Sequence, residues 1–373
     1  MSGGAAVPDL LSRTASLVAV PSVSRHEAAL ADLVWAELSG RAPWLELERV
    51  GNNLVARTQL DREQRIVLAG HLDTVPPNGN ETPQVTDDVC WGLGATDMKG
   101  GLAVLIELAL GQPTPAVDVT WVFYACEEVD QRLNGLRELA ARRPALLEGD
   151  AAVLCEPTGA RVEAGCQGTL RLAVTLAGER AHTARPWMGR NAVHRLAPLL
   201  GRVASYEGRR PVLDGCQFRE SLQVVRVEGG VANNVVPDQA RVLINYRFAP
   251  DRSVDEAVAH VEEALGDCLD REGGDTVVVD DAAAPAPPAL RHPLLAGLLQ
   301  ATGVPARAKL GWTDVSFFAS QGTPAANFGP GDPTLAHTAA EHVSRGQLET
   351  VYAALSRLIA GSGTPRSTGG RPG

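Results

Sequence analysis

Three short runs of almost unbroken apolar residues constrain the fold more than any other feature of this 373-residue sequence. They are RIVLAGHLD (65–73), VTWVFYACEE (119–128) and DAAVLCEP (150–157), and each has the length of a strand rather than of a helix. Helical segments, KGGLAVLIELAL (99–110) and LNGLRELAARR (133–143), lie between them. Apolar strands that alternate with helices indicate a largely parallel sheet covered on both faces. The sequence therefore predicts an α/β domain.

The middle of the chain has a different pattern. TLRLAVTLAG (169–178), LQVVRVEGG (222–230) and ARVLINYRF (240–248) alternate between apolar and polar residues, and two helical segments lie among them. This βαββαβ order predicts a separate α+β domain of the ferredoxin-like kind. A Pro/Ala connector at 282–289 then leads back to helices and a strand, so the second domain is expected to be an insertion. The predicted parts are 1–167 and 286–360 for the main domain, 168–285 for the inserted domain, and 361–373 for a disordered tail.

The charge balance excludes some partners. Lys and Arg number 34 against 44 Asp and Glu, which gives a formal net charge of −10 and argues against nucleic-acid or anionic-membrane partners. No apolar run approaches the ~20 residues of a membrane span. The six cysteines form no CxxC pair, so we expect reduced thiols and a cytoplasmic protein.

Each of the three apolar runs ends in side chains that bind metals. His71 and Asp73 end the first run, Glu127 and Glu128 the second, and Glu156 the third. The carboxyl ends of parallel strands meet at one edge of a sheet, so these groups are expected to converge. A strand-end histidine is often structural and a Glu pair is often a solvated turn. Together, however, these carboxylates would bury uncompensated charge, and a cation removes that cost.

Two further segments extend the candidate site. Asp97 lies in the Gly-rich turn WGLGATDMKGG just before a helical segment. The turn GPGDPTLAHTAAEHV (329–343) offers a second histidine, His337 or His342. Mixed His, Asp and Glu ligands favour zinc, or cobalt or manganese, over calcium. The joint pattern therefore predicts a metal site.

Five motifs, GHLDTVP, GLGATDMKGG, ACEEVD, CEPT and AHTAAEHV, occur in this order between about residues 15 and 360. In order and spacing they resemble the dinuclear zinc family of aminoacylases, carboxypeptidases and desuccinylases. The resemblance implies a zinc-binding catalytic domain with an inserted lid domain that forms a homodimer interface. It also implies a small N-acyl amino acid as the substrate.

The resemblance assigns a role to each polar residue of the motifs. It implies that Asp97 bridges two zinc ions, for which cobalt or manganese could substitute. The further metal ligands that it implies are His71 and Glu156 for one ion, and Glu128 and His337 for the other. Glu127 would be the general base, and Asp73 would orient His71.

Two details of the motifs carry separate expectations. In this family the peptide bond after the bridging aspartate is typically cis, which implies a cis bond between Asp97 and Met98. The family usually has Asn or Asp before the Glu that follows the last histidine, whereas this chain has Ala340 before Glu341. His342 therefore stays an alternative to His337.

The inserted domain carries the residues expected to meet the substrate. His182, in AHTARPWMGRNAVH, matches the lid histidine that reaches across the dimer to stabilise the oxyanion, although a core histidine is the structural alternative. By the same resemblance the expected substrate contacts are Asn233, Asn234, Arg247, Gly311, Thr313 and Asp314. A guanidinium such as that of Arg247 suits bidentate binding of a carboxylate.

A group of arginines reverses the acidic balance locally. Only one acidic residue, Glu207, accompanies them between positions 180 and 210. The group suggests anion binding, and a solvated basic helix face is the alternative for its helical members. Its members are Arg180, Arg185, Arg190, Arg195, Arg202, Arg209 and Arg210.

Within the family, AGCQGTLR and AHTARPWMGRNAVHR resemble the desuccinylases of the high-GC Gram-positive type. This implies hydrolysis of N-succinyl-LL-2,6-diaminopimelate to succinate and LL-2,6-diaminopimelate, in lysine biosynthesis. Cys166 and Gln167 depart from the proteobacterial form, which usually has arginines there. The alternatives are an N-acetylornithine deacetylase, a dipeptidase of the same family, and a catalytically dead metal-binding homologue.

Overall fold

The computed structural model describes residues 8–361, which form two compact units. Among the described residues, the first unit consists of 8–164, 289–307 and 317–361, and the second of Gly165–Pro288 and Ala308–Ser316. We expected all of 286–360 to belong to the main domain, whereas Ala308–Ser316 clusters with the second unit, where it contacts residues 166, 167 and 284. The predicted disordered tail lies, apart from Gly361, outside the described residues.

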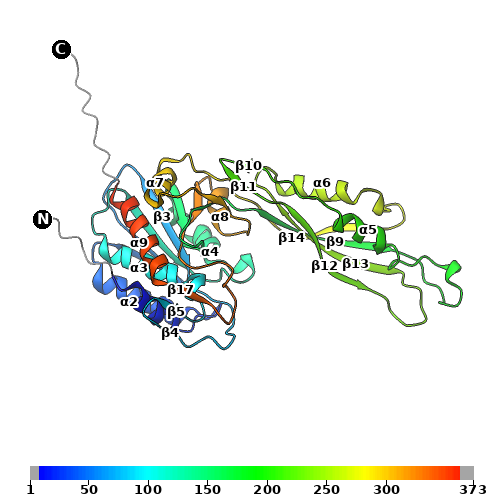
Figure 1. The fold of residues 1–373 in the computed structure, drawn as a ribbon, viewed down its shortest axis with the longest axis horizontal. Coiled ribbons are helices and arrows are strands. Elements are labelled where there is room, and N and C mark those ends of the chain that lie inside the picture. The colour runs from blue at the N-terminus through cyan, green and yellow to red at the C-terminus, as the bar shows by residue number, and fades with distance from the viewer. Residues whose placement is uncertain (1–7, 362–373) are drawn as a thin grey trace, which may run out of the picture. The chain divides into compact units, whose positions relative to one another are not determined.

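The first unit is built on an eight-stranded sheet (Figure 1). Its central strands β6, β3, β7 and β16 are parallel, and β1 and β2 add an antiparallel edge. The order is β1 (Glu46–Val50), β2 (Asn53–Arg57), β6 (Asp118–Tyr124), β3 (Arg65–His71), β7 (Ala151–Leu154), β16 (Ala325–Asn327), β8 (Glu163–Ala164) and β15 (Arg307–Ala308). The three apolar runs are thus the neighbouring strands β6, β3 and β7.

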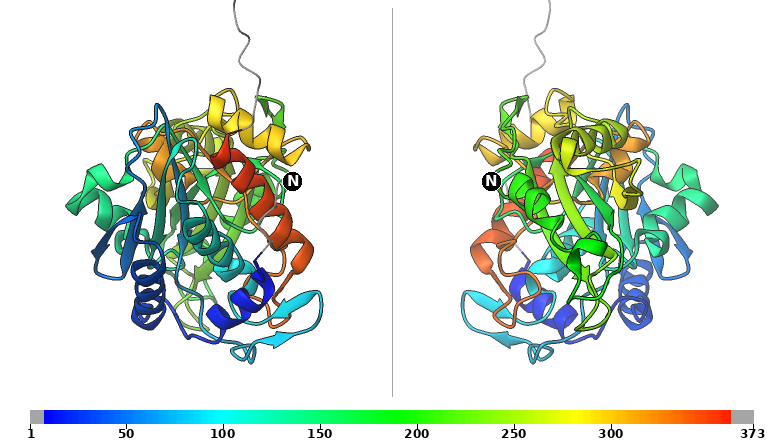
Figure 2. Two further views of the ribbon diagram at one scale, coloured as in Figure 1. Left: turned by 90° about the vertical axis from the view of Figure 1, so that its left-hand side faces the viewer. Right: turned by 90° about the vertical axis from the view of Figure 1, so that its right-hand side faces the viewer.

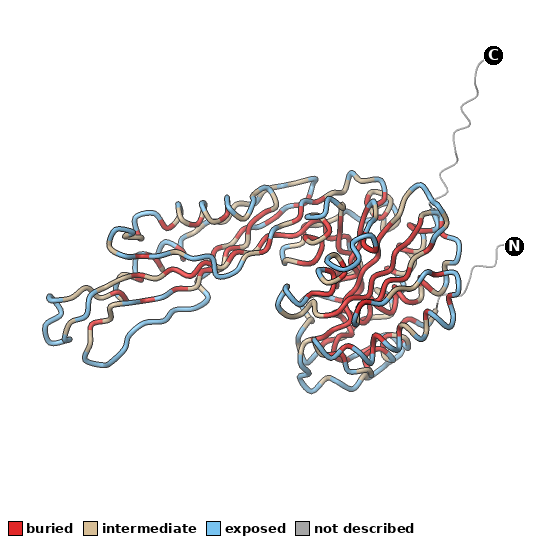
Figure 3. The backbone as a smooth tube through the Cα atoms, turned by 180° about the vertical axis from the view of Figure 1, so that it is seen from behind, coloured by how far each residue is buried: buried red, intermediate tan, exposed pale blue. Residues whose placement is uncertain are grey.

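Helices of the first unit bury the sheet. Helix α3 packs against β3 and β6 and also contacts α1 and α9, which is why its apolar residues extend around its whole circumference. Figure 2 shows the helices beside the sheet, and Figure 3 shows that the buried backbone of this unit is concentrated in the central strands. The helices are α1 (Leu10–Val18), α2 (Ala28–Arg41), α3 (Gly100–Gly111), α4 (Gly135–Arg142), α7 (Pro293–Thr302), α8 (Val315–Ser320) and α9 (Arg345–Ala360).

A small antiparallel sheet fastens the segment after His337 to the turn before α3. Its strands are β17 (His342–Ser344), β5 (Val89–Trp91) and β4 (Gln84–Val85), and His342 pairs with Trp91. Residues 340–344 are therefore placed beside residues 89–97, although about 250 positions separate them in sequence.

The second unit has a separate core and an antiparallel sheet of order β12–β13–β9–β14. The strands are β9 (Gly168–Ala177), β12 (Ser221–Gly229), β13 (Gln239–Phe248) and β14 (Thr276–Ala283), with helices α5 (Leu196–Ala204) and α6 (Val254–Leu265). A short hairpin, β10 (Val212–Leu213) and β11 (Cys216–Gln217), precedes β12. This βαββαβ arrangement is ferredoxin-like. The predicted fold class, a mostly parallel α/β domain with an inserted α+β domain, is confirmed.

Helix capping corrects one local prediction. Ser24 and Glu27 have the spacing of a capping box, a pattern that predicts the start of a helix. Instead α2 begins after Glu27, which makes no side-chain cap. A capping box is present instead at α6, where Ser253 and Glu256 exchange the two hydrogen bonds. Ser24 serves another purpose, described below.

Two further findings concern the membrane and redox expectations. Within residues 8–361, no helix combines the length and the apolar character that crossing a membrane requires. All six cysteines are unpaired thiols.

A buried carboxylate stabilises the second unit. Glu220 lies between β11 and β12 and accepts hydrogen bonds from the guanidinium of Arg209 at 2.7 and 3.0 Å and from the Ala249 main chain at 3.1 Å. Burial alone would raise the pKa of Glu220, but the Arg209 and Ala249 hydrogen bonds outweigh it and lower the pKa. The ionised form therefore stabilises the fold above the unfolded-state pKa, and this stabilisation is lost as the pH falls through the folded pKa.

We predict that Glu220→Gln lowers the free energy of unfolding by ~2 kcal/mol at neutral pH. The expected loss of stability is moderate because Arg209 is 38% exposed and water screens the pair. The difference from the wild type should shrink below about pH 4, where the wild type loses the same interaction. Urea unfolding across pH measures this, with the exposed Glu272→Gln as the matched control. An unchanged gap between pH 7 and pH 3 would contradict the prediction.

Candidate metal centre

The carboxyl ends of β3 and β7 and the turn before α3 supply a first group of ligand atoms. His71 ends β3, Glu156 follows β7 by two residues, and Asp97 lies in the Ala95–Lys99 turn. Their ligand atoms lie within 4.8 Å of one another, and His71 Nε2 is 3.1 Å from Asp97 Oδ1. The expected cis peptide bond between Asp97 and Met98 is present.

A second group shares Asp97 with the first. It contains Glu128, which follows β6, and His337, and its ligand atoms also lie within 4.8 Å of one another. His337 Nε2 is 2.8 Å from Glu128 Oε1 and 3.6 Å from Asp97 Oδ2. All five residues proposed as ligands from the sequence are therefore together, and the one that belongs to both groups is Asp97.

His342 lies outside both groups. Its ring stacks on Trp91 with centroids 4.0 Å apart, and its Nδ1 is 2.8 Å from the Ala340 carbonyl oxygen. His337 is instead the histidine beside Asp97, and its backbone has a φ of +63°, which suits the tight turn that carries it. The structure thus places His337, and not His342, in the cluster.

Asp73 faces the far ring nitrogen of His71 and also contacts the chain after β6. His71 Nδ1 lies 3.0 Å from the main-chain oxygen of Asp73, while the carboxylate is 3.5 Å away. The Asp73 carboxylate also accepts the main-chain N–H groups of Glu127 at 3.0 Å and Glu128 at 3.1 Å. Ser24 Oγ donates to the same carboxylate at 2.7 Å. Asp73 thereby fixes the backbone of the two adjacent glutamates.

The charged groups of the cluster shift one another's pKa values. Burial alone would raise the pKa of Asp97, but hydrogen bonds from His337 and His71 hold it well below its usual range. Hydrogen bonds to Asp97 and Glu128 raise the pKa of His337 to about 10. The imidazoles and carboxylates of the cluster therefore interact strongly with one another.

Glu341 is a residue of the centre that the sequence did not single out. Its carboxylate is 2% exposed and accepts the main-chain N–H groups of Gly94, Thr96 and Asp97, each at 3.0 Å. In the sequence, Glu341 is only the acidic residue that follows Ala340 in the last motif. A sequence pattern gives no signal for such contacts, because the partners are main-chain groups about 245 positions away.

In the second unit the predicted substrate residues form two groups at opposite ends of the sheet. His182 and Asn234 adjoin, because Thr183 N donates to the Asn234 oxygen at 3.0 Å and His182 forms a bridge with Val235. This group, which includes Asn233, is exposed and precedes β13.

The other group lies at the far end of β13. It contains Arg247 and the segment with Gly311, Thr313 and Asp314, and Cys166 Sγ contacts the Thr313 oxygen at 3.7 Å. Eight residues of extended strand separate Gln239 from Arg247, which is roughly 26 Å. One copy of the second unit therefore does not bring all of the predicted contacts together.

The arginine group does not form the predicted anion site. Five of its seven members pair with carboxylates of the same unit, at 2.6–2.8 Å. The pairs are Arg180–Asp238, Arg190–Asp270, Arg195–Asp275, Arg202–Asp267 and Arg209–Glu220. These acids lie up to 80 residues along the chain, so the run of arginines in sequence is not an excess of positive charge in space.

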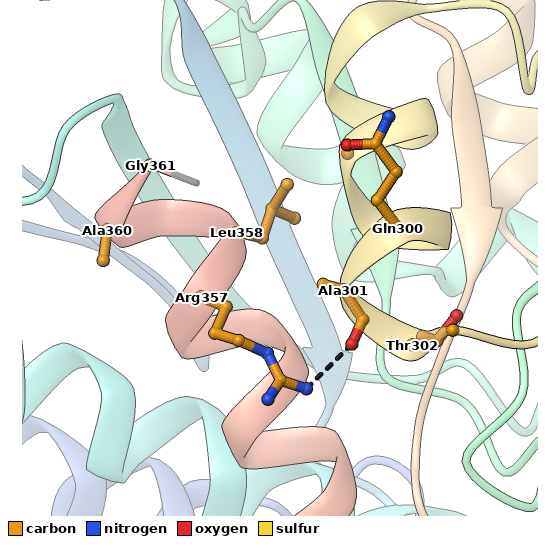
Figure 4. Close-up of a pocket in the computed structure, with 9 residues that line it drawn as sticks. Gln300, Ala301, Thr302, Arg357, Leu358, Ala360 and Gly361 are labelled. Atoms are coloured by element: carbon orange, nitrogen blue, oxygen red, sulfur yellow. Dashed lines mark hydrogen bonds between the residues drawn. The ribbon is translucent and has the colours of Figure 1, made fainter. Parts of the chain in front are cut away.

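A cavity of 590 Å³ between the carboxyl ends of α7 and α9 contains none of the predicted site residues. Arg357 crosses it and donates to the Ala301 oxygen at 2.7 Å, which satisfies a carbonyl at the end of α7 (Figure 4). We assign this cavity no part in the metal centre.

Solved structures share the fold. An aminopeptidase PepT from Bacillus cereus superposes with a TM-score of 0.76 at 19% identity, covering 94% of this chain and 97% of that one. A Bacillus subtilis protein described as a dinuclear metal binding peptidase from the M20 family gives a TM-score of 0.69 at 15% identity, with 94% and 96% covered.

Sequence comparisons give nearer relatives. A putative succinyl-diaminopimelate desuccinylase DapE of Mycobacterium tuberculosis is 49% identical over 353 residues, covering 95% of this chain and 98% of that protein. A succinyl-diaminopimelate desuccinylase of Corynebacterium glutamicum is 44% identical over 352 residues, covering 93% and 95%. The family model described as peptidase family M20/M25/M40 matches residues 67–361. This chain belongs to the M20/M25/M40 peptidase family.

Proposed function

We propose that this chain is a metal-dependent amidohydrolase that cleaves N-succinyl-LL-2,6-diaminopimelate into succinate and LL-2,6-diaminopimelate, a step of lysine biosynthesis. The observation that carries the proposal is the pair of ligand groups that share Asp97. The substrate is suggested by the relatives from Mycobacterium tuberculosis and Corynebacterium glutamicum, which match over 95% and 93% of this chain and are named desuccinylases. These names favour this function over deacetylation, dipeptide hydrolysis or a catalytically dead protein.

The donor set fits two divalent ions. Three carboxylates and two imidazoles meet in a largely buried cluster, and their charges need a cation. Nitrogen and oxygen ligands of this kind suit zinc, with cobalt or manganese as substitutes. His71, Asp97 and Glu156 would hold one ion, and Asp97, Glu128 and His337 the other. Two bound ions supply Lewis acidity, which polarises the scissile carbonyl and acidifies water.

Glu127 is the proposed general base. Its backbone is held by the Asp73 carboxylate beside that of Glu128, while its own side chain belongs to neither ligand group. Glu127 takes a proton from the attacking water as the hydroxide adds to the acyl carbon. It then gives that proton to the nitrogen as the C–N bond breaks, so that the amine leaves neutral. No covalent bond to the chain is formed.

We predict that the metal-loaded protein hydrolyses N-succinyl-LL-2,6-diaminopimelate and that Glu127→Gln lowers kcat by ~10²–10⁴-fold, the usual contribution of a positioned acid–base group. Removal of metal with a chelator should abolish turnover, and added zinc should restore it. Steady-state kinetics measure both effects. The exposed Glu148→Gln is the matched control. Full activity in Glu127→Gln would refute the role of this residue, and turnover of N-acetylornithine alone would refute the substrate.

Arg247 is the proposed anchor for a substrate carboxylate. Arg247 is partly buried in β13, and among residues 8–361 its side chain forms no hydrogen bond or ion pair. Burial lowers the pKa of Arg247, yet a guanidinium stays charged at neutral pH. A partly desolvated cation without an acidic partner is suited to an anionic ligand such as the distal carboxylate of a succinyl group.

We predict that Arg247→Ala lowers kcat/KM for the succinyl substrate by at least about 30-fold, or ~2 kcal/mol, because the buried carboxylate would lose its partner. Any residual turnover of N-acetylornithine should change little, since an acetyl group has no carboxylate. Arg247→Lys should recover part of the loss. The control is the exposed Arg219→Ala. An equal loss on both substrates would show that Arg247 acts on the fold and not on the acyl group.

A homodimer through the second unit is part of the proposal. The His182 group and the Arg247 group lie at opposite ends of β13, roughly 26 Å apart, which is too far for one small substrate. If both groups act on substrate, one of them must come from a second copy. His182 would then donate a hydrogen bond to the oxyanion in the partner's site, together with Asn233 and Asn234. Gly311 and Thr313 would line the site with Arg247.

The edge strand β12 is the proposed contact. It pairs only with β13 in the sheet order, and the exposed valines Val225 and Val227 lie on it. An unpaired edge with apolar side chains favours strand pairing with another chain.

We predict a dimer of about twice 39.3 kDa in sedimentation at micromolar concentration. Val227→Lys should shift the protein toward monomer and lower turnover in parallel, because a lysine on an edge strand opposes pairing. The matched control is Val304→Lys, an exposed valine of the first unit. A wild-type protein that is monomeric and fully active would refute the dimer.

A cytoplasmic location completes the proposal. The six unpaired cysteines fit a reducing compartment. Fractionation of source cells would test it, and recovery outside the cytoplasmic fraction would refute it.

A further inference from the structure

We propose that Glu341 is a positioning residue that fixes the spacing of the two ligand groups, an inference that rests on the proposed two-metal function. Its carboxylate accepts the N–H groups of Thr96 and Asp97 through Oε1 and that of Gly94 through Oε2, each at 3.0 Å. It therefore acts on the backbone of Asp97, the ligand that both groups share.

The contacts suit a side chain with two acceptor oxygens, since both oxygens of Glu341 accept main-chain N–H groups. Three N–H groups converge on one point because Gly94 has a φ of +78° and turns the chain before Asp97. Such successive N–H groups form an anion-binding concavity. The Lys99 ammonium, which donates to the Val20 oxygen at 2.8 Å, adds electrostatic attraction toward Glu341. An amide in place of the carboxylate would present N–H to N–H on one side.

Glu341 also joins the two loops that carry ligands. It follows His337 by four residues, and its own main-chain oxygen accepts Gly92 N at 3.0 Å. The Asn80 side chain donates to the Thr338 oxygen at 3.1 Å, on the same loop as His337. Displacement of Glu341 would therefore move the Asp97 turn and the His337 turn relative to each other.

Loss of the Glu341 contacts should lower the metal affinity of the two ligand groups unequally. His71 and Glu156 come from the ends of the neighbouring strands β3 and β7, which the sheet holds in place without Glu341. The His337 side chain is 50% exposed and lies on a turn outside any strand or helix. The group of Asp97, Glu128 and His337 should therefore lose more affinity than the group of His71, Asp97 and Glu156.

The test is calorimetric titration of metal-free protein with Zn²⁺, using Glu341→Gln, Glu341→Asp and the exposed Glu349→Gln as the matched control. Glutamine has only one acceptor oxygen. Aspartate is shorter by one methylene, so both of its oxygens lie farther from the N–H groups. We expect the affinity of the weaker zinc site to fall at least about tenfold in both variants, the loss usual for a group that orients a metal ligand, and that of the tighter site to fall less. The control should bind both ions as the wild type does.

Circular dichroism and urea unfolding of the metal-free variants separate positioning from stability. Both zinc affinities within threefold of the control, whatever the change in unfolding, would overturn the inference, as would failure of both variants to fold or a wild type that binds one ion. Two bound ions without hydrolysis of the succinyl substrate would instead refute the proposed function. The role of Glu341 would stand in that case, because its readout is metal affinity.

Discussion

Buried carboxylates that accept main-chain N–H groups are the interaction on which the rest of the centre depends. Asp73 fixes the chain after β6, and Glu341 fixes the chain before α3. Loops that leave the edge of a sheet lack the ladder of main-chain hydrogen bonds that holds a strand in place. In a low-dielectric interior a carboxylate with several N–H donors is a strong substitute for that ladder. The ligand side chains can then be directed inward because their backbones are already fixed.

The two units differ in how their charged residues are arranged. The first unit gathers Asp97, Glu128 and Glu156 at one sheet edge, where acids are useful only beside a cation. The second unit neutralises most of its arginines internally and leaves Arg247 without a recorded acidic partner among the described residues. A positive group is thus kept available in an acidic chain because its neighbours are satisfied elsewhere.

Much of this could be predicted from the sequence. The apolar runs ending at His71, Glu128 and Glu156 predicted the parallel strands and the shared edge, because burial on both faces leaves a clear pattern. Ser24 and Glu341 could not be assigned, because each acts through groups distant in sequence. Ser24 matched a capping box and instead binds Asp73. The prediction of anion binding by the arginines between 180 and 210 failed for the same reason, since the carboxylates that pair with them lie far along the chain.

The length of β13 limits how this chain can vary during evolution. Loops of the second unit can gain or lose residues at small cost. A single insertion within β13 would turn Arg247 to the other face of the sheet, because successive side chains alternate. A two-residue insertion would restore the face but move Arg247 about 6–7 Å away from the Asn234 end. The length of β13 therefore sets the spacing between Arg247 and the Asn234 end, independently of which residues occupy the strand.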